Sequence, residues 1–410
     1  MKIPHFLWSY FNSEKIIYSF FCFFISLLLF LTNNLPELND INPSGFIDIY
    51  SYISIANSWN SEELFRLASE IPYHHLQRWP IHLLVGGMST LFKVNLLDTY
   101  RFIIFSILLF IAIIIWKFKA KLVNKIIYFS IIILNPYSLR LYLYSPPLVH
   151  DFLFILVIVI FILAVINKNQ SYLLLSIALS VFSRQTAIML VPITITYCYF
   201  FPFLKKIAIM YSILIIMIFW LFMMLTNQIF GQDPGSSLIF HVIGLFKWIL
   251  NPLMDGTFEF FRSFGFFIIT LAPLMLLRIS YRSIPIAFIG TFFIALQPIL
   301  AGPSLTGSNA ARLIAYSLPF IAIISLEKKQ TISSATIIIF LLFMNSLHHW
   351  YSNFMPVDGI VFFGKNFRSI EIYGAIVFTI LGSLILNKLI KLFYNNKPFF
   401  SFLNKQSIHN

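Results

Sequence analysis

Long apolar runs separated by short polar connections fill most of this chain. A helix needs about twenty residues to cross the hydrocarbon layer of a membrane, and runs of that kind recur along the whole sequence. They lie near 16–33, 100–116, 126–144, 152–167, 171–183, 186–204, 207–226, 258–277, 283–301, 311–326, 331–347 and 371–390. The pattern predicts an all-α, polytopic helical membrane protein with about twelve transmembrane helices, of which 126–144 and 171–183 are short or interrupted. We expect one membrane domain over residues 1–410.

The longest polar interval, residues 33–100, follows directly on the first apolar run and holds seven of the fifteen acidic residues. After the turn sequence NPSG at 42–45, apolar residues return at helical spacing, which predicts an amphipathic helix with Asp48 near its start. The residues of that apolar face are Ile49, Tyr52, Ile53, Ala56 and Trp59. Two further apolar stretches, 80–92 and 237–250, are predicted to lie at the membrane surface rather than to cross it.

Composition agrees with a membrane protein. Hydrophobic residues make up 59% of the chain, charged residues 10%, and the mean hydropathy is +0.86, whereas soluble domains carry about 25% charged residues. The net charge of +13 comes largely from lysines in the short connections, which is the positive-inside pattern and not a nucleic-acid surface. The expected location is the inner (plasma) membrane, with several passes, both termini in the cytoplasm and the 33–100 loop outside.

Arginine is distributed differently from lysine. In this topology eight of the ten arginines fall on the outer side or at its membrane edge, namely Arg66, Arg78, Arg101, Arg140, Arg184, Arg262, Arg312 and Arg368. The planar guanidinium group suits bidentate contact with phosphate oxygens. We therefore expect Arg78, Arg184 and Arg312 to hold a phosphate-bearing headgroup, with Gln185 beside Arg184. The alternative is that these arginines extend to the interface or pair with carboxylates of the loop.

Asp48 is the leading candidate for a catalytic base, because a carboxylate at the membrane surface could take a proton from an acceptor hydroxyl. The competing interpretation is that Asp48 only caps its helix. His150 and Asp151 follow Pro146–Pro147 at the start of another span; they could orient the acceptor or bind a divalent cation with Asp48, or simply form a solvated helix start. Adjacent histidines such as His74–His75 do not converge on one metal ion, although His75 alone could contact a phosphate or a sugar.

Taken together, these segments resemble the GT-C superfamily of polyprenyl-phosphate-dependent membrane glycosyltransferases. The resemblance rests on GFIDIYSYISIANSW, YHHLQRWPIHLL, LNPYSL with SPPLVHDFLFIL, FSRQTAIMLVP and GSNAARLIAYSLP. It implies an essential Asp in the first outer loop a few residues before a Tyr, here Asp48 and Tyr52, and a second acidic or histidine-containing turn, here His150–Asp151. Many members carry two adjacent acids in the first loop, whereas Ile49 follows Asp48 here.

The resulting functional hypothesis is an enzyme that moves a sugar from a polyprenyl-phosphate donor to a glycan or lipid-linked acceptor in cell-surface glycan assembly. In a single displacement Asp48 would take the acceptor proton, while Tyr52 and His150–Asp151 shape the sugar and acceptor sites. No cofactor is certain, no metal ligand is assigned, and a divalent cation stays open. The alternatives are a surface polysaccharide polymerase or ligase of the O-antigen type, and a transporter or flippase of lipid-linked glycans.

Overall fold

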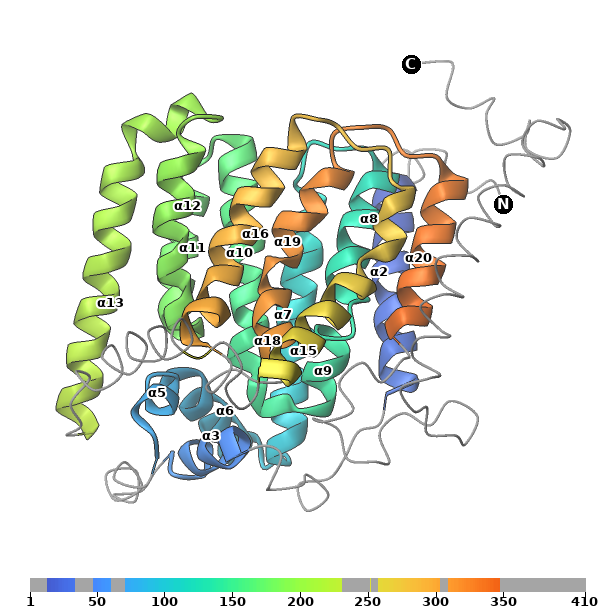
Figure 1. Ribbon diagram of the computed structural model, residues 1–410. Helices are drawn as coiled ribbons and strands as arrows, with labels where there is room; N and C mark the ends of the chain where they lie inside the picture. The colour runs from blue at the N-terminus through green and yellow to red at the C-terminus, as the bar shows by residue number, and fades with distance from the viewer. Residues whose placement is uncertain are drawn as a thin grey trace, which may run out of the picture.

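Every regular element in the described part of the chain is a helix (Figure 1). The computed structural model describes residues 13–33, 47–59, 71–230, 251, 257–302 and 309–346. The turn predicted at 42–45, the surface helix at 237–250 and the span at 371–390 lie outside these ranges. The other eleven predicted spans each coincide with helical segments.

Five helices of the described ranges are long and apolar enough to cross a membrane. They are α2 (Ser13–Leu31), α7 (Leu96–Trp116), α10 (Val149–Asn167) with the preceding turn η3 (Pro146–Leu148), α13 (Ala208–Phe230) and α16 (Ser283–Ala301). The described part of the chain is therefore all-helical and contains several candidate membrane spans, as the apolar runs predicted. Shorter apolar helices fill the bundle between them.

Several predicted spans are broken into pieces, and proline explains where. The segment 126–144, predicted to be short or interrupted, is indeed interrupted: α8 (Leu122–Ile133) ends before Asn135–Pro136, and α9 (Leu139–Tyr144) begins after them. Pro136 has no N–H to donate to a helix, and the Asn135 side chain accepts a hydrogen bond of 3.0 Å from the backbone N–H of Tyr137. The remaining segments are α11 (Gln170–Ser183), η4 (Gln185–Met189), α12 (Leu190–Tyr197), η5 (Pro202–Lys206), α15 (Thr257–Thr270), η6 (Ala272–Leu276), α18 (Ala310–Ile314), η8 (Ala315–Ser317), α19 (Leu318–Ala322), η9 (Ile323–Ser325) and α20 (Ile332–Ser346).

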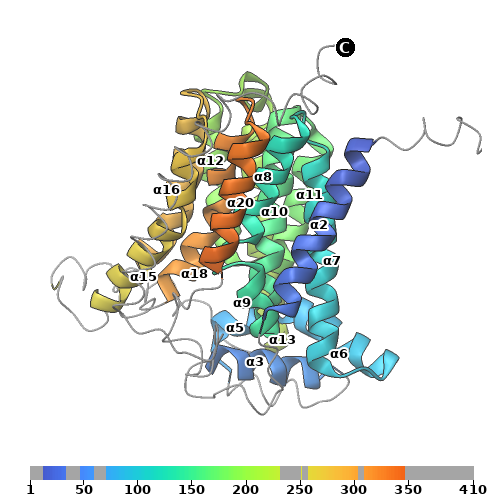
Figure 2. The same cartoon turned by 90° about the vertical axis from the view of Figure 1, so that its right-hand side faces the viewer.

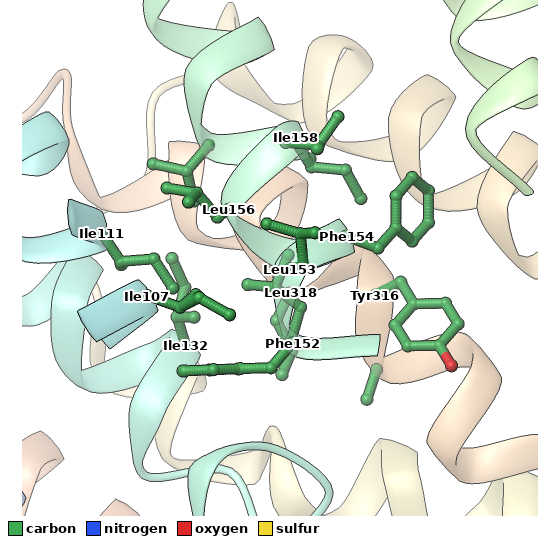
Figure 3. Packing of buried hydrophobic residues seen from close by; sticks show 14 of the residues in the cluster. Ile107, Ile111, Ile132, Phe152, Leu153, Phe154, Leu156, Ile158, Tyr316 and Leu318 are labelled. Carbon is green, nitrogen blue, oxygen red and sulfur yellow. The ribbon is translucent and has the colours of Figure 1, made fainter. Parts of the chain in front are cut away.

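Helix α10 is the centre of the bundle. It packs against α7, α11 and α19, and every residue from Val149 to Val165 is buried. A helix that is apolar on all sides is stable only when other elements surround it. Figure 3 shows this packing, with Leu153 and Phe154 of α10 among side chains of the neighbouring helices. The first turn of α10 carries the only two polar residues of this buried stretch, His150 and Asp151.

Three helices, α3 (Ile47–Asn57), α5 (Tyr73–Leu76) and α6 (Trp79–Phe92), form a layer across one end of the bundle (Figures 1 and 2). Four residues of the predicted apolar face of α3 are buried, Ile49, Tyr52, Ile53 and Ala56. Trp59 differs: it is 49% exposed, and its ring lies over Gly87 of α6. We call these three helices the end layer.

The opposite end of the bundle is rich in basic residues. Ten exposed lysines and arginines lie in its connections: Lys117, Lys119, Lys121, Lys168, Lys205, Lys206, Arg278, Arg282, Lys328 and Lys329. Lys125 lies near the same end, in the first turn of α8. Its Nζ donates a hydrogen bond of 2.8 Å to the carbonyl oxygen of Trp116 and lies 4.2 Å from the centre of the Trp116 ring.

A buried cluster of arginines, histidines and tyrosines

Asp151 lies at the centre of a polar cluster where the bundle meets the end layer. The carboxylate is fully buried, and its Oδ1 lies 2.8 Å from Nη1 of Arg184 while its Oδ2 lies 3.6 Å from Nε of Arg312. Nε2 of His150 lies 3.0 Å from the same Oδ1. The structure thus joins residues that are far apart in the sequence. The interpretation of His150–Asp151 as a solvated helix start is wrong, because both side chains are inaccessible.

Arg184 reaches Asp151 because the chain is extended between α11 and η4 at that position (φ −146°, ψ 151°). Its Nη1 also donates to the hydroxyl of Tyr316, and its guanidinium carbon lies 5.2 Å from the centre of the Tyr316 ring. In Figure 3 the Tyr316 ring borders the apolar side chains around α10 and its hydroxyl points away from them. Tyr316 therefore separates the apolar core from the charged cluster.

Tyr52 of the end layer forms the second half of the cluster. Nη1 of Arg78 donates to its hydroxyl. The Tyr52 ring stacks on His82, with centroids 4.4 Å apart and an interplanar angle of 10°. It also meets His150 edge to face at 4.7 Å and lies tilted against His75 at 5.3 Å. Such contacts between aromatic rings hold the side chains in fixed orientations. Tyr52 thereby connects the end layer to the first turn of α10.

A residue of α7 holds the His82 ring in place. Its Nδ1 lies 2.8 Å from the hydroxyl of Tyr100, and that hydroxyl donates to the backbone carbonyl of Tyr52. Burial lowers the pKa of His82 well below its usual value, and the neighbouring His150 and the positive charge of Arg78 act in the same direction. His82 is therefore a neutral imidazole that supports the Tyr52 ring.

Glutamine contacts close the other side of the end layer. Nε2 of Gln185 donates to Oε1 of Gln77, next to Arg78 in the chain. The hydroxyl of Thr186 donates a 2.9 Å hydrogen bond to Oε1 of Gln297 on α16. The irregular segment after α11 thus contacts both the end layer and the bundle, which fixes Arg184 between them.

Several buried groups of the cluster have no hydrogen-bond partner among the described residues. Among them are Nε of Arg78, Nε of Arg184, both ring nitrogens of His150, Oδ2 of Asp151 and the hydroxyl of Tyr142. The Tyr142 hydroxyl faces the charges of Asp151, Arg184 and Arg312. A buried donor without a partner costs about 1–3 kcal/mol, more when it is charged. Two guanidinium N–H groups and a hydroxyl favour a ligand that supplies negatively charged oxygen atoms.

Arg78 strengthens this conclusion. Its side chain is buried, and among the described residues it contacts no carboxylate: its contacts are the hydroxyl and the ring of Tyr52. A buried cation without a counter-ion is costly. An anion bound beside Arg78 would remove that cost.

Two other arginines from the sequence-based set serve the fold instead. Arg140 donates to the backbone carbonyl and to the hydroxyl of Thr32, at 2.8 and 2.7 Å, so it caps the C-terminal end of α2, where a positive charge is favourable. Arg101 pairs with Asp98 one turn earlier. For Arg101 the alternative of pairing with a carboxylate of the loop is correct; Arg140 is fully buried, and its bonds to Thr32 stabilise the end of α2. Arg66, Arg368 and the side chain of Arg262 lie outside the described residues.

Asp48 is the second residue of α3, so its predicted place at a helix start is confirmed. Its side chain lies outside the described part, and its role as a base stays a prediction. The same holds for a divalent cation bound with its help. Among the described residues no three His, Cys, Asp or Glu side chains form a group that could hold a metal ion.

Sequence reasoning missed four residues of the cluster, His82, Tyr100, Tyr142 and Tyr316. Each lies inside an apolar stretch, where a tyrosine or histidine is usually a core residue. A helical-spacing test would have found one of them, because Arg78 and His82 are four residues apart and so share a helix face. The others come from helices that are distant in the sequence, and no spacing links them.

No family model matches the chain, no curated protein matches it, and no solved structure matches it.

Proposed function

We propose that this chain is an integral membrane glycosyltransferase that takes its sugar from a polyprenyl-phosphate donor. The observation that carries the proposal is the buried cluster around Asp151, Arg184 and Arg78, with its unpartnered cationic donors, at one end of an apolar helical bundle. A ligand with an anionic headgroup and an apolar chain is suited both to the cationic cluster and to the apolar bundle. The phosphate binds the guanidinium groups, and the chain stays in the lipid.

The charge of the cluster suits the chemistry of transfer. When the anomeric C–O bond breaks, the phosphodiester of the donor becomes a phosphomonoester, and negative charge grows on the departing oxygen. Arg78 and Arg184 would bind this developing charge more strongly than the charge of the intact donor. Interactions that strengthen in the transition state are those that accelerate a reaction.

The position of the cluster favours an enzyme over a transporter. Secondary transporters place their sites near the middle of the membrane, on interrupted helices. Here the charged residues lie at the first turn of α10, beneath the end layer, and the rest of that helix is apolar. In the proposed topology the end that carries the cluster faces outward, and the ten exposed basic residues of the other end face the cytoplasm. The chain would cross the membrane about twelve times in a GT-C-like layout.

The remaining cluster residues would bind the sugar and the acceptor. Tyr52 and His75 lie on the end-layer side of the cluster, and Gln185 is half-buried on the opposite side. Amide and imidazole groups are suited to hydrogen bonds with sugar hydroxyls. A polymerase or ligase that uses pyrophosphate-linked oligosaccharides is the chemically related alternative.

Binding of the product lipid tests the proposal whatever the identity of the sugar. The protein in lipid nanodiscs is titrated with polyprenyl phosphate and with the polyprenol of the same length. We expect the phosphate to bind at least about tenfold more tightly, and Arg78→Gln to remove about tenfold, because a charge-assisted hydrogen bond contributes about 1.5–3 kcal/mol. Arg101→Gln is the matched control, since Arg101 pairs with Asp98, and it should bind as the wild type does.

A transfer assay completes the test. Proteoliposomes receive a panel of polyprenyl-phosphate hexoses and pentoses and, separately, polyprenyl-pyrophosphate oligosaccharides, and release of the polyprenyl phosphate or pyrophosphate is followed. Turnover of one of the polyprenyl-phosphate donors supports the proposal. Equal affinity for polyprenyl phosphate and polyprenol would contradict it, and turnover restricted to polyprenyl-pyrophosphate oligosaccharides would replace it with the polymerase or ligase.

A further inference from the structure

A transferase of this kind needs a group that accepts the proton of the attacking hydroxyl, and the geometry around Asp151 shows which group is suited to it. Asp151 itself is not. One of its oxygen atoms lies 2.8 Å from Arg184 and the other 3.6 Å from Arg312. Two neighbouring cations stabilise the ionised carboxylate and make it a weak base.

His150 differs from Asp151 in its contacts. Its imidazole is fully buried, and Nε2 lies 3.0 Å from Oδ1 of Asp151. Neither ring nitrogen makes a hydrogen bond of good geometry among the described residues, and the close carboxylate contact is made by Nε2 and not by Nδ1. A neutral imidazole carries one proton and one lone pair; a proton on Nε2 is favoured by the adjacent carboxylate, and the lone pair is then on Nδ1. A base whose second nitrogen is oriented by a carboxylate is a recurring arrangement in enzymes.

The ring of His150 is also held in place from the end layer. Tyr52 meets it edge to face at 4.7 Å, and His82 lies 5.4 Å away in a similar geometry. These contacts fix the direction of Nδ1. The proton acceptor is therefore positioned beside the arginines that would bind the donor phosphate, without a contribution from residues outside the described part.

We propose that His150 is the catalytic base of the transfer and that Asp151 orients it. This inference rests on the proposed function and replaces Asp48 in the role of base. The acceptor oxygen attacks the anomeric carbon and forms the new C–O bond, while the bond from that carbon to the phosphate oxygen breaks and its electron pair stays on polyprenyl phosphate. The hydroxyl proton moves to Nδ1 of His150, and the resulting imidazolium later returns it to water.

An acceptor that carries no proton tests this assignment. Azide ion attacks the anomeric carbon directly and yields a glycosyl azide, so it needs no base. With the donor that the wild type uses, His150→Asn should lower transfer to the hydroxyl acceptor by about 10²–10⁴-fold. Transfer to azide should stay within about threefold of the wild-type rate with azide. Arg184→Gln is the comparison variant: it removes a phosphate contact, so azide should not restore its rate.

Polyprenyl phosphate binding shows whether His150→Asn is folded, because the arginines remain in that variant. Unchanged hydroxyl transfer by His150→Asn would overturn the inference while leaving the proposed function intact. A His150→Asn protein that binds polyprenyl phosphate but transfers to neither acceptor would also overturn it. If azide restored the transfer rate of Asp48→Asn but not that of His150→Asn, the catalytic base would be Asp48. If the wild type turns over no donor in the panel, the proposed function fails and this assignment fails with it.

Discussion

The pair formed by Asp151 and Arg184 shows at the scale of single residues why charges can persist inside this bundle. Both side chains are almost completely buried, and their 2.8 Å contact offsets part of the cost of removing them from water. Such a pair contributes little net stability. Removing one partner is different, since it leaves the other charge buried without compensation.

A double-mutant cycle measures this asymmetry. Asp151→Asn is expected to destabilise the protein by about 3–5 kcal/mol, because Arg184 and Arg312 then face no carboxylate. Arg184→Gln should cost less, since Arg312 still faces Asp151. The double variant should lose clearly less unfolding free energy than the sum of the losses in the two single variants. Thermal unfolding in detergent gives the three values, and strict additivity would show that the two groups do not interact.

At this scale the sequence indicated the charged members of the cluster together with Tyr52, His75, His150 and Gln185. Arg184 was recognisable because it interrupts apolar residues, where a charge is costly without a function or a partner. Arg312 was expected from the arginines of the outer side, and Asp151 from the turn at Pro146–Pro147. Tyr142 and Tyr316 carry no such signal, since a tyrosine is ordinary in a helix core. Arg140 also interrupts apolar residues, and yet it caps α2. A charged residue in an apolar segment therefore indicates that the residue has a role, but not which role it has.

At the scale of elements, the contact between α3 and α6 decides where Tyr52 lies. A Cβ atom added at Gly86 would lie 1.9 Å from the carbonyl oxygen of Ala56, so the two helices can approach this closely only because Gly86 has no side chain. Tyr52 is one turn before Ala56 on α3. The spacing of the α3–α6 contact therefore sets the position of the Tyr52 ring against His82 and His150.

Gly86→Ala should separate α3 from α6. We expect a loss of about 1–3 kcal/mol or more from overpacking, since the opposing atom is backbone and cannot rotate away. The binding of polyprenyl phosphate should weaken as well. Gly265→Ala in α15 is the matched control, because nothing lies within 4 Å of a Cβ there and alanine favours a helix over glycine. Thermal unfolding and lipid titration of both variants check this; equal midpoints would show that the contact is not tight.

The sequence predicted the positions of the helices better than it predicted where each helix begins and ends. Apolar periodicity located the helices and the amphipathic face of α3, because burial acts on every residue of a face at once. Interruptions were harder to place. The NP dipeptide at Asn135–Pro136 is a local signal that divides α8 from α9. The pairing of α3 with α6 depends instead on the contact of Gly86 with Ala56, and no local pattern predicts a contact between residues so far apart in the sequence.

At the scale of the whole molecule, the two ends of the bundle differ in chemistry. One end has the end layer over the buried cluster, and the other has ten exposed lysines and arginines in its connections. Positive connections remain on the cytoplasmic side of a membrane protein. Since α7 has 21 residues at 1.5 Å per residue, it is about 31 Å long, which is sufficient to place its two ends on opposite sides of the membrane.

Cysteine labelling at the two ends of α7 tests the resulting topology. Val94 precedes this helix and Lys119 follows it, and both are exposed. In a background of Cys22→Ser and Cys198→Ser, a maleimide that cannot cross membranes should label Val94→Cys in intact cells. It should label Lys119→Cys only after permeabilisation. The reverse pattern would place the buried cluster on the cytoplasmic side, where the acceptors of outer-surface glycan assembly are absent. Labelling of both positions in intact cells would mean that α7 does not cross the membrane, and the positive-inside argument would then have no basis in this chain.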